Sequence, residues 1–370
     1  MMQESFNYKI ENINDIDTPA LVLYPSIIAR NIQHLIKLCG NVNQIRPHVK
    51  THKCPQVVQL LLKAGITKFK CATIAEAEML AAVGAADVLL AYQPVGPKVR
   101  RFISLMQKYP ECIFSCLMDD ELAATAISDA ANAADIKIRC FIDLNVGMNR
   151  TCVTPDEEAR RLVIYSSKLS GINVIGLHAY DGHVIDQDVN IRNHKAEEAY
   201  KSVCNFNKEM IGIGFTSLHI VAGSTPTLSF YASRPEVECC SGTFIYWDQH
   251  YSNSYPELPF EFAALVLTRV VSKPALNSFC LDLGYKAVSS ESALNERVNL
   301  IDLQAREITS QSEEHLMITT TNELQLGQVI YGVPYHIGRT CNLYEAAGVV
   351  EQQNVKRFWN NIARSRKLTI

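Results

Sequence analysis

The sequence has little net charge and no long apolar run. Its 35 lysines and arginines nearly balance its 38 aspartates and glutamates, so a net charge of −3 gives no sign of a nucleic-acid or membrane partner. No stretch approaches the roughly 18 uninterrupted apolar residues of a membrane span. Residues 1–17 are polar and mildly acidic, without the basic start and apolar core of a signal peptide. We therefore expect a cytoplasmic protein.

Two common motifs are also missing. The 12 cysteines include no CxxC pair, so in a cytosolic chain we expect reduced, buried thiols that act as small core residues. No GxGxxG follows the first predicted strand, at residues 21–24, which argues against a dinucleotide-binding fold. The 370 residues, 48% of them hydrophobic, are enough for one large domain and a smaller one.

Short apolar runs alternate with helical patterns over residues 18–257. After the first strand and a helix through Ile36, eight further strand-like runs follow, at residues 44–49, 68–72, 88–92, 113–117, 138–144, 174–177, 218–222 and 237–240. Such alternation predicts parallel strands covered by helices. Eight units predict an α/β fold of the (β/α)8 TIM-barrel type, with an open doubly wound sheet as the alternative.

The pattern changes near Tyr255-Pro256. Short extended runs with few helical signals follow, at residues 263–271, 278–283, 314–320, 328–331 and 347–350. They predict a compact antiparallel β domain over residues 258–370. We expect residues 1–17 to pack onto this second domain.

Lys50 stands out because it ends the predicted strand at residues 44–49, on the rim where such barrels place their active sites. Nearby cations disfavour a charged lysine and lower its pKa. A neutral lysine can form an imine with an aldehyde such as pyridoxal 5′-phosphate (PLP). Lys53 is a rival for this role, but we expect it to begin the next helix. The cations around Lys50 in the sequence are Arg46, His48, His52 and Lys53.

Other polar residues follow later strands of the predicted barrel. Gly223-Ser224-Thr225 and Gly242-Thr243 follow the last two strands, where glycine backbone and hydroxyl groups can cradle a phosphate. Two ordinary turns are the alternative reading for these glycines.

Further candidates follow the two strands before those. Arg150 can hydrogen-bond the phenolic oxygen of PLP, or it can make a surface salt bridge. His178, Tyr180 and His183 can stack on or hydrogen-bond a cofactor or substrate, although a single histidine is more often structural.

These motifs together resemble the D-threonine aldolase and D-serine dehydratase-like proteins, which share the alanine racemase barrel (fold-type III PLP enzymes). The resemblance covers nearly the whole chain, and the basic segment around Lys50 is its most specific part. The residues that carry it are 46–53, 143–150, 176–183, 222–227, 241–244, 281–286, 312–315 and 333–336.

The resemblance implies a PLP enzyme that works as a head-to-tail homodimer. It implies that Lys50 bears the cofactor, that Arg150 contacts its phenolic oxygen, and that the turns at Gly223 and Gly242 hold its phosphate. His336, from the second domain, would act at the barrel mouth of the other subunit.

One departure from the family concerns the metal. Active members hold zinc or manganese with a histidine and, two residues later, a cysteine or aspartate. Here the matching residues are His336 and Gly338, and glycine has no side chain to bind a metal; Cys341 lies three residues further on. We therefore expect weak or absent metal binding, with His336 as the one candidate ligand and a candidate general acid or base.

The resemblance leads to a PLP-dependent lyase for a D-β-hydroxy amino acid, acting as an aldolase or a dehydratase. One alternative is an amino-acid racemase or epimerase, with Lys50 on one face of the ring and His178, Tyr180 or His336 on the other. Another is a PLP-binding protein with little turnover.

Overall fold

The computed structural model describes residues 8–301, 303 and 306–370. These residues divide into two compact units, each built from two separate parts of the chain. One unit, called here the strand-rich unit, takes the described residues up to Ile32 and Thr243–Asn361. The other, the barrel unit, takes Gln33–Gly242 and Ile362–Ile370. The predicted domains, 18–257 and 258–370, follow the chain continuously, whereas these units interleave along it.

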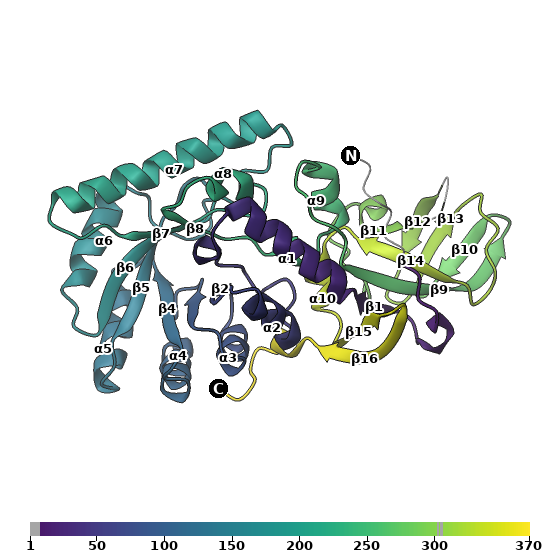
Figure 1. Cartoon of the computed structure of the whole chain (residues 1–370), viewed down its shortest axis with the longest axis horizontal. Coiled ribbons are helices and arrows are strands. Elements are labelled where there is room, and N and C mark those ends of the chain that lie inside the picture. Colours follow the sequence, from purple (N-terminus) through teal and green to yellow (C-terminus); the bar gives the residue numbers. More distant parts are fainter. Residues whose placement is uncertain (1–7, 302, 304–305) are drawn as a thin grey trace. The chain divides into compact units, whose positions relative to one another are not determined.

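The barrel unit contains a sheet of parallel strands that follow one another in sequence order (Figure 1). Each strand pairs with the next in parallel, and a helix lies between most neighbours in the chain. The strands are β2 (Lys68–Cys71), β3 (Asp87–Leu90), β4 (Ile113–Met118), β5 (Ile138–Asp143), β6 (Ile172–Ala179), β7 (His219–Ala222) and β8 (Val237–Cys239).

The predicted strand at residues 44–49 is not a regular strand, and in this respect the sequence-based prediction is wrong. Gln44 ends a 3-10 helix (Val42–Gln44), and Pro47 lacks the N–H that a continuous ladder needs. The segment still bridges the two edge strands. Ile45 pairs with Cys239 and His48 with Lys70, both in parallel. It therefore occupies the place of the missing barrel strand between β8 and β2.

The space inside the strands is filled by side chains. A cluster of buried residues joins Leu89, Leu117, Phe141, Val221 and Cys240, which come from five different strands or strand ends. Gly176 leaves room for this packing, because a Cβ at that position would lie 2.4 Å from the ring of Phe141. A filled interior is typical of such barrels, so any ligand must bind at the rim.

Helices cover the outside of the barrel strands, and side chains satisfy several of their first N–H groups. Thr73, Asp120 and Asp156 cap α3, α5 and α6 in this way. The helices of this unit are α2 (Pro55–Lys63), α3 (Ile74–Ala82), α4 (Pro97–Lys108), α5 (Glu121–Ala133), α6 (Glu157–Ser167), α7 (Val189–Gly212) and α8 (Leu228–Ala232).

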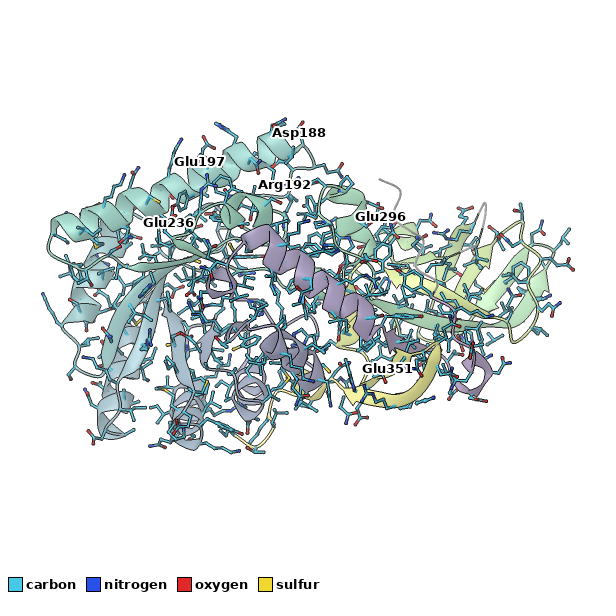
Figure 2. All side chains as sticks on the ribbon, viewed as in Figure 1. Asp188, Arg192, Glu197, Glu236, Glu296 and Glu351 are labelled. Atoms are coloured by element: carbon cyan, nitrogen blue, oxygen red, sulfur yellow. The ribbon has the colours of Figure 1, made fainter. Side chains whose placement is uncertain are left out.

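Asp188 and Arg192 lie at the start of α7, where the loop that follows β6 ends (Figure 2). Asp188 caps the helix by accepting from the backbone N–H groups of Asn190 and Ile191. Arg192, only 1% exposed, donates to the backbone carbonyls of Asp186 at 2.7 Å and Gln187 at 3.0 Å. These bonds hold in place the end of a loop whose first residues, after β6, carry candidate site residues.

The strand-rich unit is built on a mixed, largely antiparallel sheet. Its strands run in the order β12-β13-β10-β9-β1-β15-β16, with β14 also on β9 and β11 on β14. They are β1 (Ala20–Leu23), β9 (Ala264–Ala275), β10 (Ser278–Leu281), β11 (Val298–Leu300), β12 (Glu307–Gln311), β13 (Leu316–Thr319), β14 (Val329–Pro334), β15 (Ala346–Glu351) and β16 (Asn354–Asn360). Only β1 and β15 pair in parallel among these contacts.

Short helices and the N-terminal residues complete this unit. Tyr8 donates to the carbonyl of Phe262 at 3.2 Å, and Asn12 donates to that of Val355 at 2.9 Å. The expected packing of residues 1–7 lies outside the described residues. The helices are α1 (Pro25–Cys39), which continues into the barrel unit, α9 (Gln249–Ser254) and α10 (Ile337–Cys341).

The predicted fold class, an α/β barrel with a separate β domain, is confirmed. Within the described ranges, every helix is too short or too polar to cross a bilayer.

Candidate functional site

A cavity of about 590 Å³ lies at the carboxyl ends of the barrel strands. Its walls come from His48, Lys50 and the ends of β2 to β6, so it occupies the rim where such barrels bind ligands. Among its lining residues are Lys50, Lys70, Asp143, Arg150, His178 and Tyr180.

Lys50 lies in the turn that follows residues 45–49, and its side chain is open to the cavity. The surrounding walls nevertheless remove much of its water, and this burial is the largest cause that lowers its pKa to about 8. The positive charges of Lys70 and Arg150 lower the pKa further. A substantial fraction of Lys50 is therefore neutral slightly above neutral pH, as a nucleophilic amine requires.

Two of the four cations expected to lower the pKa of Lys50, Arg46 and His52, are not among its causes. Arg46 is 2% exposed and pairs with Asp87 at 2.7 Å and Glu238 at 2.6 Å, so its charge is compensated. Burial lowers the pKa of His52 to about 3, which leaves that ring uncharged. The charges that lower the pKa of Lys50 most belong instead to Lys70 and Arg150 at other strand ends, with a smaller contribution from the neighbouring Lys53.

Lys53 is held by a different partner. Its amine forms an ion pair with Glu76, a carboxylate with no exposed surface, which also accepts from the backbone N–H of Ala72 at 2.7 Å. The expectation that Lys53 begins a helix is wrong: its φ is +51°, and α2 begins at Pro55, a residue favoured at a first helical position. Lys50 is thus the better-placed nucleophile of the two.

Three cationic side chains lie near the ring of Tyr180. Arg150 Cζ lies 5.2 Å from the ring centroid, Lys70 Nζ 5.5 Å and Lys50 Nζ 5.8 Å. Cations favour the electron-rich face of an aromatic ring at such distances. The structure therefore brings together Lys50, Arg150 and Tyr180, which the sequence analysis proposed separately, and creates a positively charged pocket suited to an anionic, flat ligand.

His178 faces the same cavity but already has two side-chain partners. Its Nδ1 lies 2.5 Å from Asp143 Oδ1, and its Nε2 lies 2.8 Å from Lys70 Nζ. Burial, followed by the charge of Lys70, lowers the pKa of His178, so the imidazole is neutral. Burial opposes ionisation of Asp143, but His178, Cys152 and Lys70 together outweigh it, so the pKa of Asp143 is also lowered.

Lys70 was not predicted as a site residue, and Asp143 was given no role. Lys70 lies near the end of a strand, Lys68-Phe69-Lys70-Cys71, and in the structure only 4% of it is exposed. Lysine is rarely buried without a partner, so an inward-facing lysine near a barrel rim is a useful marker. Its contact with His178, 108 residues away, could not be read from the sequence.

The two glycine turns meet in the structure. Thr225 Oγ1 lies 3.0 Å from Ser241 Oγ, which joins the loops after β7 and β8. Gly223 has a φ of +92°, and a Cβ there would lie 2.7 Å from the ring of Tyr231, so only glycine fits. A Cβ on Gly242 would lie 2.9 Å from the carbonyl of His48, which lines the cavity.

The buried carboxylate of Asp181 lies behind the first of these turns. Burial raises its pKa to about 6, while the hydroxyls of Thr227, Ser224 and Tyr231 oppose this change. The Ser224 N–H donates to Thr227 Oγ1 at 3.0 Å, and the phosphate-binding role of this loop stays a prediction. Thr243, the last residue of the proposed cradle, begins the 3-10 helix Thr243–Ile245 of the strand-rich unit, and its part in the cradle stays a prediction.

His183 packs against the loop after β5, where a Cβ on Gly147 would lie 2.5 Å from its Nε2. His336 belongs to the strand-rich unit, where it caps α10: its Nδ1 accepts from the backbone N–H of Arg339 at 3.3 Å. Cys341, at the end of that helix, is 1% exposed.

No cluster of three or more His, Cys, Asp or Glu side chains that could hold a metal is found in the described part of the chain. The expectation of weak metal binding rests on Gly338 and stays a prediction.

Comparisons with known proteins identify the family and the fold of this chain. Residues 25–235 match the family model "Alanine racemase, N-terminal domain", and residues 263–350 match "Putative serine dehydratase domain". The chain is similar to a D-threonine aldolase from Arthrobacter sp, with 27% identity over 94% of this chain and 93% of the relative. It is 24% identical to a D-threo-3-hydroxyaspartate dehydratase from Delftia sp., over 75% of this chain and 73% of the relative.

Solved structures show the same fold. The crystal structure of D-threonine aldolase from Filomicrobium marinum superposes with a TM-score of 0.89 at 25% identity, covering 97% of this chain and 98% of that one. The Delftia dehydratase structure superposes with a TM-score of 0.82 at 20% identity, over 94% and 98% of the two chains. Because the alanine racemase model covers more than half of the sequence, this chain belongs to the family defined by the alanine racemase N-terminal domain.

Proposed function

We propose that this chain is a PLP-dependent lyase for a D-β-hydroxy amino acid, working as an aldolase or as a dehydratase. The observation that carries the proposal is the amine of Lys50, whose pKa is lowered to about 8 and which opens into the same cavity as Arg150 and Tyr180. The similarity to a D-threonine aldolase and to a D-threo-3-hydroxyaspartate dehydratase supports this class of substrate.

The residues of the barrel unit fit PLP. Lys50 would bond to its aldehyde, Arg150 would pair with its phenolic oxygen, and the turns at Gly223 and Gly242 would donate to its phosphate. Tyr180 would contribute a flat surface for the ring. When bound, PLP supplies an electron sink for cleavage of a bond at the substrate's Cα.

The chain's own residues would supply positioning and proton transfer. The Arg150 guanidinium, which cannot lose its proton, would keep a neighbouring oxygen ionised. In the dehydratase version of the reaction, the amine of Lys50 takes the proton from Cα. In the aldolase version, a base takes the proton of the β-hydroxyl as the Cα–Cβ bond breaks.

We also infer a homodimer with its active site at the interface, in which His336 serves the barrel mouth of the other subunit. A divalent metal would assist the β-oxygen in related enzymes, and here Gly338 leaves His336 as the one candidate ligand. We therefore expect the reaction to depend little on added zinc or manganese.

An amino-acid racemase is the second candidate. The observation that favours it is the second amine in the cavity, Lys70, because a racemase needs two groups that exchange a proton with Cα. Chiral chromatography distinguishes the two: an inverted substrate indicates a racemase, whereas glycine or a keto acid indicates a lyase.

Absorbance spectroscopy tests the proposal directly. The purified protein mixed with PLP should show a band at about 420 nm, typical of PLP bonded to a lysine, and borohydride should fix the label on Lys50. D-threonine, D-serine and D-alanine are then added with and without manganese or zinc, and the products are identified.

Two variants with the same chemical change give a matched control. Lys50→Arg should abolish the band, because a guanidinium does not form this bond, whereas Lys53→Arg should keep both the band and the ion pair with Glu76. A borohydride label on another residue, or no label, would overturn the assignment. A strong rate increase with metal would show that the expectation based on Gly338 is wrong.

A further inference from the structure

Three buried side chains form a hydrogen-bonded chain that ends in the cavity. Asp143 Oδ1 lies 2.5 Å from His178 Nδ1, and His178 Nε2 lies 2.8 Å from Lys70 Nζ. An ionised carboxylate only accepts, so Nδ1 carries the proton of the neutral ring and Nε2 accepts from Lys70. Asp143 therefore fixes the direction of both hydrogen bonds.

The immediate partner of Lys70 distinguishes it from Lys53, a half-buried lysine nearby. Lys53 faces the carboxylate of Glu76 directly, which makes a closed ion pair. Lys70 faces a neutral ring at one side, with the thiol of Cys240 beside it, and it lines the cavity. A lysine amine nitrogen has three positions that carry hydrogens or a lone pair. His178 engages only part of them, so at least one other position of the Lys70 amine can point toward the cavity.

The local surroundings place Lys70 next to the reacting groups. Lys50 and Lys70 both approach the ring of Tyr180, at 5.8 and 5.5 Å from its centroid. Lys70 is also the neighbour whose charge lowers the pKa of Lys50 most. The other titratable or charged side chains that line this cavity are His48, Tyr92, Asp119, Asp143, Arg150, Cys152, His178 and Tyr180.

We propose that Lys70 is a second proton-transfer residue of this site and that His178 and Asp143 are positioning residues for it. The proposal rests on the function proposed above. In the aldolase reaction, the neutral form of Lys70 takes the proton of the β-hydroxyl on its Nζ lone pair as the Cα–Cβ bond breaks, and the O–H electron pair becomes the second bond of the product aldehyde. Lys70 later returns a proton to Cα, where the pair from the broken bond forms the new C–H bond.

Two substitutions of Lys70 separate proton transfer from charge. Lys70→Gln removes both, whereas Lys70→Arg keeps a positive charge that does not release its proton. In the PLP-loaded protein, we expect kcat for D-threonine to fall by about 10²- to 10⁴-fold in both variants, with KM changed by less than about threefold. Wild-type kcat in either variant would overturn the proposal. Circular dichroism and the band at about 420 nm verify that each variant folds and binds PLP.

A second measurement follows the amine itself in the protein without PLP. Competitive labelling with acetic anhydride, read by mass spectrometry, reports the reactivity of each lysine. His178→Met removes the acceptor that holds the Lys70 amine, so the amine is freer to meet the reagent and its labelling should rise several-fold. His178→Gln offers an amide oxygen in its place and should stay near wild type. Lys195, which is ion-paired with Asp186 on the surface, serves as the internal reference.

The two measurements distinguish the possible failures. Equal labelling of Lys70 in wild type, His178→Met and His178→Gln would overturn the positioning role. The wild-type protein alone tests the proposed function. If it forms no bond between PLP and Lys50, the proposed function is wrong, and so is the proton-transfer role of Lys70. If PLP binds and D-threonine is cleaved but the Lys70 variants react normally, only the present inference fails.

Discussion

At the scale of single residues, the site depends on which lysine keeps its amine available. Lys50 and Lys53 are three positions apart, yet the buried carboxylate of Glu76 engages Lys53, while Lys50 faces cations. A partner's charge changes lysine chemistry more than the local sequence does. The position of Glu76, on a helix that follows another strand, therefore decides which of the two lysines can react.

The pH dependence of PLP capture should report the lowered pKa of Lys50. The neutral amine reacts, and its fraction rises as pH increases through the pKa, so the rate of band formation should rise with a midpoint near pH 8. Arg150 is one cause of the low pKa, so Arg150→Met should move the midpoint to higher pH. Stopped-flow absorbance measures both.

Arg161→Met provides the control for this experiment. Arg161 pairs with Glu121 on the surface, and its side chain is 71% exposed. Its loss should leave the midpoint where it is. A midpoint near 10, the usual range of a lysine, would contradict the electrostatic description of the cavity.

The sequence could predict part of this residue-level site. Lys50, Arg150 and Tyr180 each follow a predicted strand, and the rule that barrel strands end at one rim brings them together. Lys70 was not predicted, because inside a short strand an inward and an outward lysine look alike without the positions of the neighbouring strands. The depressed pKa of Lys50 was expected, but two of the cations named for it, Arg46 and His52, are neutralised by partners or by burial.

At the scale of elements, the short segment at residues 45–49 has the main role in positioning the site. It joins β8 to β2 through few backbone hydrogen bonds, among them Arg46 N–H to the carbonyl of Cys239 at 3.0 Å. The guanidinium of Arg46 adds ion pairs to Glu238 and to Asp87. Side-chain bonds thus replace part of the ladder that an irregular segment lacks.

Arg46→Met should therefore destabilise the barrel unit. Removing one partner of a buried ion pair leaves the other charges uncompensated, so we expect the free energy of unfolding to fall by about 3 kcal/mol. Borohydride labelling of Lys50 should fall as well, because the segment positions that residue. Urea unfolding followed by circular dichroism measures the first effect.

The comparison for Arg46 is Arg160→Met. Arg160 pairs with Glu157 at the surface, with side chains 36% and 74% exposed, so its loss should cost less than about 1 kcal/mol. Equal effects of the two substitutions would show that the buried network does not hold the segment.

The element-level prediction succeeded where strands are continuous and apolar. The runs at residues 68–72, 113–117 and 138–144 correspond closely to β2, β4 and β5. The run at 44–49 was predicted as a strand because it contains apolar residues. Pro47 and the preceding 3-10 turn interrupt the backbone hydrogen bonds that a regular strand would make. The spacing of apolar residues predicts burial well, but it predicts backbone hydrogen bonding less well.

At the scale of the whole molecule, the proposed dimer gives a complementation test. If Lys50 and His336 serve one site from different subunits, Lys50→Ala and His336→Ala should each be inactive. Random mixing makes about half of the dimers heterodimeric, each with one intact site, so about a quarter of wild-type activity should return. The assay is D-threonine cleavage after the two variants are refolded together.

Two outcomes would contradict this arrangement. No recovery, with mixed dimers shown by native mass spectrometry, would place Lys50 and His336 in the same subunit's site. Full activity of His336→Ala alone would remove His336 from the reaction.

The overall architecture was largely readable from the chain, because the change in pattern near residue 256 separates a helix-and-strand region from a strand-only region. The sequence could not predict which of the two sheets each strand joins. The first predicted strand, at residues 21–24, precedes the barrel in sequence, yet β1 pairs with β9 and β15 in the strand-rich sheet. Nothing in the composition of that strand distinguishes it from a barrel strand.

The interleaving of the two units along the sequence limits how this gene can be recombined. The barrel unit resumes at Ile362, where the carboxylate of Glu78, on α3, accepts from the backbone N–H groups of Thr369 at 3.1 Å and Ile370 at 3.3 Å. Consider a chimaera made with a homologue by a single crossover inside the barrel or inside the strand-rich sheet. The hydrophobic core of at least one unit would then combine segments from both parent sequences. Exchange of a whole unit requires several crossovers, so we expect families of this kind to diversify by point substitution at the rim more readily than by module shuffling.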